Sequence, residues 1–145
     1  ATASTRRQTY IVKLDTSSGT FEADERITQA TTGAVGKVVE WDSSLSLLYY
    51  QQEEFKGFGT DATTGGYVAF SGTNQITGAS SGATGTTTGT TETVTLANAN
   101  TVSLTSGYAN PELAFPSGNI IYLENRKPIQ RASDQTEDIK VIIEF

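Results

Sequence analysis

The chain has 145 residues and a formal net charge of −6, with no cysteine and no histidine. At this length it makes one average domain, or two small modules sharing a core, and can bury about two thirds of the surface that its unfolded form exposes. Without cysteine and histidine, the usual zinc, iron and copper ligand sets, disulfides and histidine-based triads are excluded, so we predict no cofactor and no metal.

Charge and hydropathy also limit the partners. The acidic balance argues against nucleic-acid binding, which depends largely on a basic face that neutralises phosphates. No apolar run approaches the twenty residues of a membrane span, and we predict no membrane insertion. The first residue is Ala1 rather than methionine, so we expect a processed form or a fragment of something longer.

The chain is predicted to be all-β: an antiparallel β-sandwich or barrel-like domain. Short apolar runs rich in Val, Ile, Tyr, Phe and Thr are separated by Gly, Ser, Asn and Asp, which is typical of many short strands. The alternation of Tyr10, Val12 and Leu14 with other residues predicts a strand with one buried face within an N-terminal arm, residues 1–20.

A first β-module is expected over residues 21–69. Within it, GKVVEW and LSLLYY flank Asp42, Ser43 and Ser44, which predicts a hairpin whose turn uses side-chain oxygens to bond local backbone donors. Trp41, Tyr49 and Tyr50 near this turn could form a sugar-stacking platform, but a single tryptophan beside a hairpin more often packs in a core or an interface.

A second β-module, residues 70–105, begins with an internal repeat. FSGTNQITGASSGATG at residues 70–85 aligns without a gap on FEADERITQATTGAVG at residues 21–36, which predicts the same strand-turn-strand unit twice. Four large side chains should point into a core and four glycines should make tight turns: Phe21, Ile27, Phe70 and Ile76; Gly33, Gly36, Gly82 and Gly85.

The repeat leaves two further readings. Continued alignment places Val94 and Leu96 opposite Leu45 and Leu47, so the Thr-rich residues 82–95 are expected to form a hairpin, with a flexible loop as the alternative. A phosphate-binding loop is disfavoured because the glycines lack the required spacing and no helix follows them.

The acidic residues give little support for catalysis. The doublets are best interpreted as solvated strand ends or turns, because adjacent strand residues face opposite sides; a two-carboxylate glycosidase remains the alternative. DATTGG, residues 61–66, is interpreted as an Asx-type turn rather than a calcium loop. The doublets are Asp24-Glu25, Glu53-Glu54 and Glu137-Asp138.

The last block, residues 106–145, contains two apolar runs, NIIYLE and IKVIIEF, with a polar connection between them. Pro128 restricts the residue before it and removes a backbone donor, while Asp134 and Glu137 have the spacing of a capping box. We expect two strands joined by a turn or one helical turn, whose charged groups either satisfy the local backbone or face a partner.

These residues resemble the extreme C-terminus of the baseplate wedge subunit of T-even-type contractile-tailed phages, the myoviruses, over about the last 29 residues. That subunit is more than twice as long, so the chain is either its C-terminal portion or a shorter relative. The resemblance and the polar connection give the predicted interface residues: Tyr122, Glu124, Asn125, Arg126, Pro128, Ile129, Arg131, Asp134, Gln135, Thr136 and Glu137.

The resemblance implies a structural virion protein rather than an enzyme. It would lie in the tail baseplate after assembly in the host cytoplasm, and would contact other baseplate or tail subunits, with pairing of two copies left open. Two other classes stay in view, a carbohydrate-binding β-sandwich module of a tail or surface protein and a carboxylate glycosidase, as does a generic virion or surface-structure protein.

Overall fold

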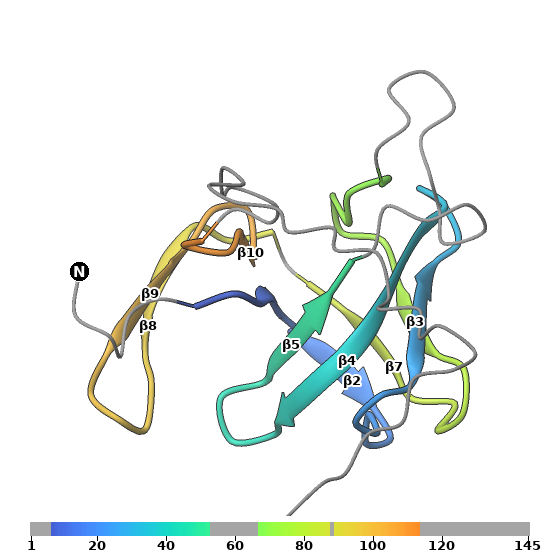
Figure 1. The fold of residues 1–145 in the computed structure, drawn as a ribbon, viewed down its shortest axis with the longest axis horizontal. Coiled ribbons are helices and arrows are strands. Elements are labelled where there is room, and N and C mark those ends of the chain that lie inside the picture. The colour runs from blue at the N-terminus through green and yellow to red at the C-terminus, as the bar shows by residue number, and fades with distance from the viewer. Residues whose placement is uncertain (1–6, 53–66, 88, 114–145) are drawn as a thin grey trace, which may run out of the picture.

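A computed structural model describes residues 7–52, 67–87 and 89–113, and within these ranges the chain is all-β (Figure 1). The described residues contain no helix, and so no helix that could cross a membrane. Several predicted features lie outside these ranges: the Glu53-Glu54 doublet, the DATTGG turn, the Glu137-Asp138 doublet and the polar connection.

In the described ranges, ten antiparallel strands form two sheets. The larger sheet has the order β10-β1-β5-β4-β3-β6-β7-β2, and the smaller pairs β8 with β9. The strands are β1 (Tyr10–Lys13), β2 (Thr16–Ser18), β3 (Arg26–Gln29), β4 (Ala34–Asp42), β5 (Leu47–Gln51), β6 (Ile76–Gly78), β7 (Thr84–Thr86), β8 (Glu92–Thr95), β9 (Thr101–Leu104) and β10 (Tyr108–Ala109).

The larger sheet curls strongly, because its two ends are held together by the chain itself. β1 pairs with β5 and β2 pairs with β7, yet only Leu14 and Asp15 separate β1 from β2. In a flat sheet these strands would lie about 29 Å apart, whereas so short a connection reaches about 11 Å. Asp15 N also donates a hydrogen bond to Thr86 O. Strands β1 to β7 therefore form a barrel-like unit, here called the barrel.

The barrel is filled by one hydrophobic cluster. Its inward positions alternate with outward ones along each strand, as the period-2 patterns predict. Tyr50 is fully buried and packs its ring edge-to-face against Phe70, with ring centroids 4.8 Å apart. The cluster consists of Val12, Leu14, Phe21, Ile27, Ala34, Val38, Leu48, Tyr50, Phe70, Ile76 and Ala83.

Trp41 belongs to this packing and is partly buried by it. It packs against the core cluster and meets Phe21 edge-to-face, with centroids 5.6 Å apart. Tyr50 points into the barrel, whereas Tyr49 packs against a second cluster on the outside. Because neighbouring strand residues face opposite sides, the two tyrosines cannot share one surface.

The predicted repeat is present as two hairpins with the same register. In β3–β4, Ile27 pairs with Gly36 and Thr28 with Val35. In β6–β7, the equivalent residues Ile76 and Gly85, and Thr77 and Thr84, pair in the same way. The four predicted core residues are all buried, and Gly33 and Gly82 both have the positive φ that the turns require. The prediction of tight turns at Gly36 and Gly85 is wrong: both lie inside strands, where an added Cβ would clash with Gln51 O and with the Leu14 side chain.

The two hairpins also pair with each other about a local twofold axis. β3 and β6 are antiparallel neighbours, with Thr28 directly opposite Thr77, its own equivalent in the repeat. The pair Ile27 and Gly78 is next to it. The repeated units, here called hairpin 1 (residues 21–36) and hairpin 2 (residues 70–85), are thus related by this axis and share one core.

The repeat does not continue beyond the hairpins. Leu47 lies in β5, which pairs with β4, but β8 pairs with β9 and not with β7. The prediction of a Thr-rich hairpin over residues 82–95 is therefore wrong: β7 and β8 belong to different sheets. Polar Thr runs set no register by themselves, and the apolar residues Val94 and Val102 pair with each other instead.

The β4–β5 turn is confirmed as a side-chain-supported turn. Asp42 Oδ1 accepts hydrogen bonds from the backbone N–H groups of Ser44 and Leu45, at 2.9 and 3.1 Å, and from the Ser44 hydroxyl. The hydrogen bond from the Ser44 hydroxyl is the main reason that the pKa of Asp42 lies below its usual value. This turn fixes the pairing of the two longest barrel strands.

Candidate interaction surface

The residues predicted for the interface all lie in residues 114–145, outside the described ranges. The interface therefore remains a prediction. What the structure does describe is the segment that leads into those residues. Residues 87 and 89–113 leave the barrel after β7 and build β8, β9 and β10.

The β8–β9 hairpin packs on the outside of the barrel, beside β1 and β5 (Figure 1). Val94, Val102 and Leu104 are buried together with Ile11 and Leu47, which are the outward residues of the two barrel strands. Each fully buried aliphatic side chain stabilises such packing by about 1.5–3 kcal/mol. The hairpin is thus firmly attached, and β10 adds a strand beside β1.

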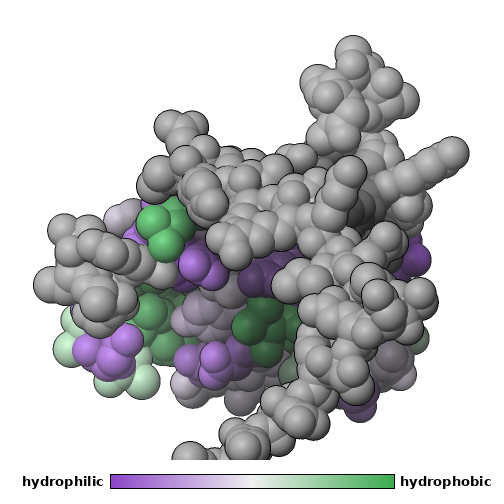
Figure 2. Space-filling model, in the orientation of Figure 1, coloured by the Kyte–Doolittle hydropathy of each residue, from purple (hydrophilic) through white to green (hydrophobic). Residues whose placement is uncertain are grey.

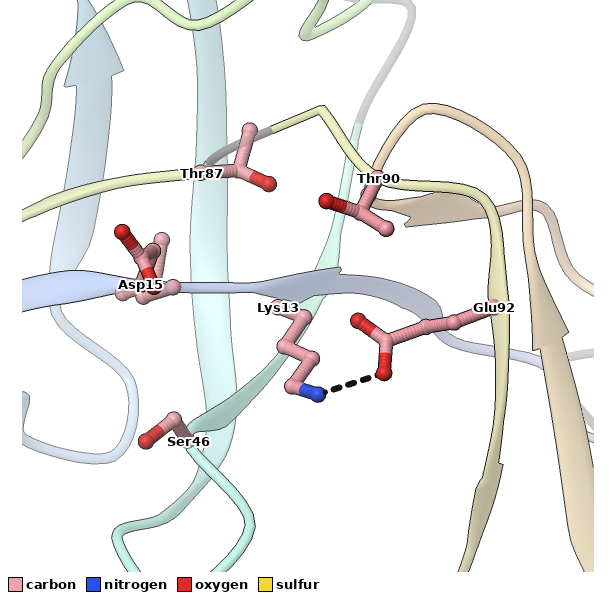
Figure 3. A pocket seen from close by; sticks show the side chains of 8 residues that line it. Lys13, Asp15, Ser46, Thr87, Thr90 and Glu92 are labelled. Carbon is pink, nitrogen blue, oxygen red and sulfur yellow. Dashed lines mark hydrogen bonds and ion pairs between the residues drawn. The ribbon is translucent and has the colours of Figure 1, made fainter.

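An ion pair closes the polar border of this contact. Lys13 Nζ of β1 lies 2.7 Å from Glu92 Oε2 of β8, and both side chains are about one third exposed, at 32% and 34%. Within the described residues, this is the one ion pair between side chains that the structure gives. Beside it is a cavity of about 310 Å³, whose lining in Figure 3 includes the Lys13 and Glu92 side chains and two hydroxyls, those of Thr87 and Thr90.

Two of the polar side chains that line the cavity already have partners. The carboxylate of Glu92 is held by Lys13, and Thr87 Oγ1 accepts a hydrogen bond from Gly89 N. In the ranges that the structure covers, no group of three or more acidic side chains is placed to hold a metal ion. The Lys13–Glu92 pair beside the cavity makes this place a joint between the barrel and the β8–β9 hairpin.

The Lys13–Glu92 pair is expected to contribute little to stability. Its exposure leaves it well solvated, so a double-mutant cycle with Lys13→Ala and Glu92→Ala should give a coupling free energy of about 0.2–1 kcal/mol in urea unfolding. The coupling should fall further at about 1 M salt, where screening acts over roughly 3 Å. A coupling well above this range would contradict a solvated joint.

The other end of this segment is tied to the N-terminal strand through Arg7. The Arg7 guanidinium donates hydrogen bonds to Thr9 O at 2.9 Å and to Asn110 O at 2.7 Å. Arg7 N donates to Glu112 Oε2, and Glu112 N donates in return to Arg7 O. The chain therefore enters residues 114–145 from a fixed position at the edge of the barrel.

The free face of the β8–β9 hairpin carries hydroxyl groups. Cross-strand pairing places Thr93 opposite Ser103 and Thr95 opposite Thr101, and all four residues are exposed. On the side seen in Figure 2, the described hydrophobic residues form separate areas interrupted by hydrophilic ones. Contacts made through the free face of the hairpin would therefore be largely polar.

A buried carboxylate was missed by the sequence reasoning. Glu25 of the Asp24-Glu25 doublet is only 5% exposed, so the interpretation of this doublet as solvated is wrong for Glu25. Its Oε1 accepts hydrogen bonds from Glu22 N and Ser81 Oγ, both at 2.7 Å, and its Oε2 accepts from the N–H groups of Ser80 and Ser81. Glu25 thereby joins hairpin 1 to the turn of hairpin 2.

A buried amide makes the matching contact. Gln29 is fully buried, and its Oε1 accepts hydrogen bonds from Ser71 N at 3.0 Å and from Thr32 Oγ1 at 2.8 Å. Its Nε2 donates to Asn74 O. Gln29 therefore joins hairpin 2 to the turn of hairpin 1. Buried polar groups inside a β-module leave no apolar signature. Only their positions could have drawn attention: Glu25 lies between Phe21 and Ile27, and Gln29 lies two residues after Ile27, on the same face of the strand.

The Glu25 carboxyl should make the free energy of unfolding depend on pH in the acidic range. Burial raises its pKa, but hydrogen bonds from Ser81, Glu22 and Ser80 lower it by more, so the pKa in the folded chain lies below the usual value. The stabilisation is thus complete above the unfolded pKa of about 4.3 and is lost as the pH falls through the folded pKa. In urea unfolding, the stability difference between the native chain and Glu25→Gln should shrink below about pH 4. A difference that stays constant down to acid pH would contradict this.

Comparison with known families finds a similarity in the segment beyond the barrel. Residues 87–145 match the family model described as Bacteriophage T4, Gp8, the T4 baseplate wedge protein. The match confirms the resemblance seen in the last 29 residues and extends it upstream through β10, β9 and β8. It begins directly after β7 ends at Thr86. No curated protein and no solved structure matched the chain.

Proposed function

We propose that this chain is a structural, non-enzymatic component of a contractile-tail baseplate wedge, acting through contacts with neighbouring subunits. The observation that carries the proposal is the match of residues 87–145 to a family of structural phage baseplate proteins. In this proposal the chain lies in the virion tail, after assembly in the host cytoplasm. Nucleic acid and membrane insertion play no part in the proposed role.

The barrel supports this role as a rigid mount. The matched segment is attached to the barrel by buried aliphatic residues, by β10 pairing and by the Arg7 contacts. A neighbour that binds the segment would therefore also orient the barrel. In this proposal the polar connection, residues 124–137, meets adjacent wedge subunits, where charged groups set register and partner choice more than affinity.

The test is reconstitution with the purified wedge subunits of the same phage. The chain should co-elute with at least one of them, and this complex should weaken with salt, as expected for a charged rim. Arg126→Ala with Asp134→Ala should weaken the complex and reduce its salt dependence. Lys37→Ala with Glu40→Ala, two exposed charges on β4 of the barrel, is the matched control. Unchanged assembly in the first variant would remove the polar connection from the interface.

The same experiment separates the remaining possibilities. Light scattering of the chain alone decides whether two copies pair, as a homodimer would require. A carbohydrate-binding module would instead change the fluorescence of Trp41 on a glycan panel and bind no wedge subunit. The edge-to-face packing of Trp41 on Phe21 supports the structural role over that alternative.

A further inference from the structure

The two hairpins share two equivalent polar sites, one on each side of their twofold axis. The first, here called the Glu25 site, is lined by Glu22 N and Ser81 Oγ. The second, here called the Gln29 site, is lined by the equivalent groups, Ser71 N and Thr32 Oγ1. Each hydroxyl oxygen also accepts a hydrogen bond from the backbone N–H two residues further on: Ser81 Oγ from Ala83 N, and Thr32 Oγ1 from Ala34 N.

The two sites are filled from different sequence positions. Gln29 fills its site from the end of β3, while its equivalent in hairpin 2 is Gly78. A Cβ at Gly78 would lie 2.6 and 2.7 Å from the carboxylate oxygens of Glu25. Gly78 therefore leaves the space that Glu25 occupies. The equivalent of Glu25 is Asn74, whose side chain bonds Ser71 O and leaves its site to Gln29.

Because hairpin 1 supplies the side chain for both sites and hairpin 2 leaves the space for it, hairpin 1 is complementary to hairpin 2. Two copies of the same hairpin are incompatible. If β3 of one copy paired with β3 of another, each site would receive both a Glu25 carboxylate and a Gln29 amide in the space of one. If β6 paired with β6, each site would hold only Asn74 and Gly78, and buried donors such as Ser71 N would lose their acceptor. Crowded and unsatisfied buried polar groups are both costly.

We propose that the pairs Glu25–Gln29 and Asn74–Gly78 act as a recognition code that directs each hairpin 1 to a hairpin 2 and blocks pairing of like hairpins between two copies of this chain. Repeated units with equal register are otherwise prone to exchange between chains during folding. The proposal concerns hairpin pairing alone and is independent of the baseplate role.

A single-cysteine reporter tests the code, since the chain has no cysteine. Thr28 lies on the twofold axis, so T28C in two copies would meet when β3 pairs with β3. The full chain is unfolded and refolded at high concentration under oxidising conditions, and disulfide-linked dimer is measured on a non-reducing gel. In the double variant Glu25→Asn with Gly78→Gln, a glutamine can fill both sites, so like hairpins become compatible. We expect the amount of T28C dimer to be about fivefold or more that of the native background, a ratio that corresponds to about 1 kcal/mol.

Two further backgrounds keep the test decisive if that variant does not refold. Glu25→Asn alone relieves the crowding when β3 pairs with β3, so the T28C dimer should increase in this background. The T77C dimer, which reports pairing of β6 with β6, should not increase. Glu25→Gln removes the same charge but keeps the bulk, and should stay at the native level. Equal dimer in Glu25→Asn and Glu25→Gln, or in all backgrounds, would overturn the proposal. Oxidation without prior unfolding gives the background from chance collisions.

Discussion

Replacing Ile27 or Ile76 with alanine is expected to lower the free energy of unfolding by about 3–4 kcal/mol in each case. Both side chains are fully buried and belong to the same core cluster, at equivalent positions of the two hairpins. Each deletion removes apolar contacts and leaves a cavity that the paired strands around it can fill only in part. Urea unfolding followed by the fluorescence of Trp41, which packs on this core, measures the loss.

Thr28→Ala and Thr77→Ala provide the matched controls. These residues are the next ones along β3 and β6 and face outward, so their replacement should change stability by less than about 1 kcal/mol. The comparison tests the repeat itself. A large loss at Ile27 with a small loss at Ile76 would mean that hairpin 2 does not share the core of hairpin 1.

Replacing Glu25 with alanine is expected to lower the free energy of unfolding by about 3 kcal/mol, although no apolar residue is lost. The carboxylate satisfies the backbone N–H groups of Glu22, Ser80 and Ser81 in a buried place. With alanine, these donors lose a charged acceptor and the space beside Gly78 opens. Chemical unfolding at neutral pH provides the measurement.

The neighbouring carboxylate Asp24 serves as the control, because it is exposed where Glu25 is buried. Asp24 has a positive φ, so Asp24→Asn is the suitable replacement, and it should cost less than about 1 kcal/mol. Glu25→Gln should fall between the two extremes, because its amide nitrogen cannot accept hydrogen bonds. If Glu25→Ala proved as mild as Asp24→Asn, the network between the hairpins would not stabilise the fold.

The joint between the barrel and the matched segment bears on how a baseplate subunit could work. The family match begins where the chain leaves the barrel, and the contact there combines a buried aliphatic cluster with a solvated ion pair. The aliphatic part fixes the attachment, and the polar part contributes little energy. In the proposed role, the barrel would follow the segment as one body when the surrounding assembly rearranges.

The sequence by itself determined the strand content, the repeat and the family resemblance. Alternation at Tyr10, Val12 and Leu14, and the aligned Phe, Ile and Gly residues of the two hairpins, depend on local periodicity and turn geometry, which are written directly in the residue order. The Asp42 turn follows for the same reason, since its hydrogen bonds link residues two and three positions apart.

Only the tertiary structure decided how these units come together. The closing of the barrel at Leu14 and Asp15, the packing of β8–β9 on β1 and β5, and the burial of Glu25 all depend on contacts between residues far apart in sequence. Ser81, for instance, lies 56 positions from Glu25. From the sequence alone, the Glu25 carboxylate next to Asp24 is indistinguishable from a solvated carboxylate in a turn. Its buried hydrogen-bond donors come from the second hairpin, and no local periodicity encodes that partner.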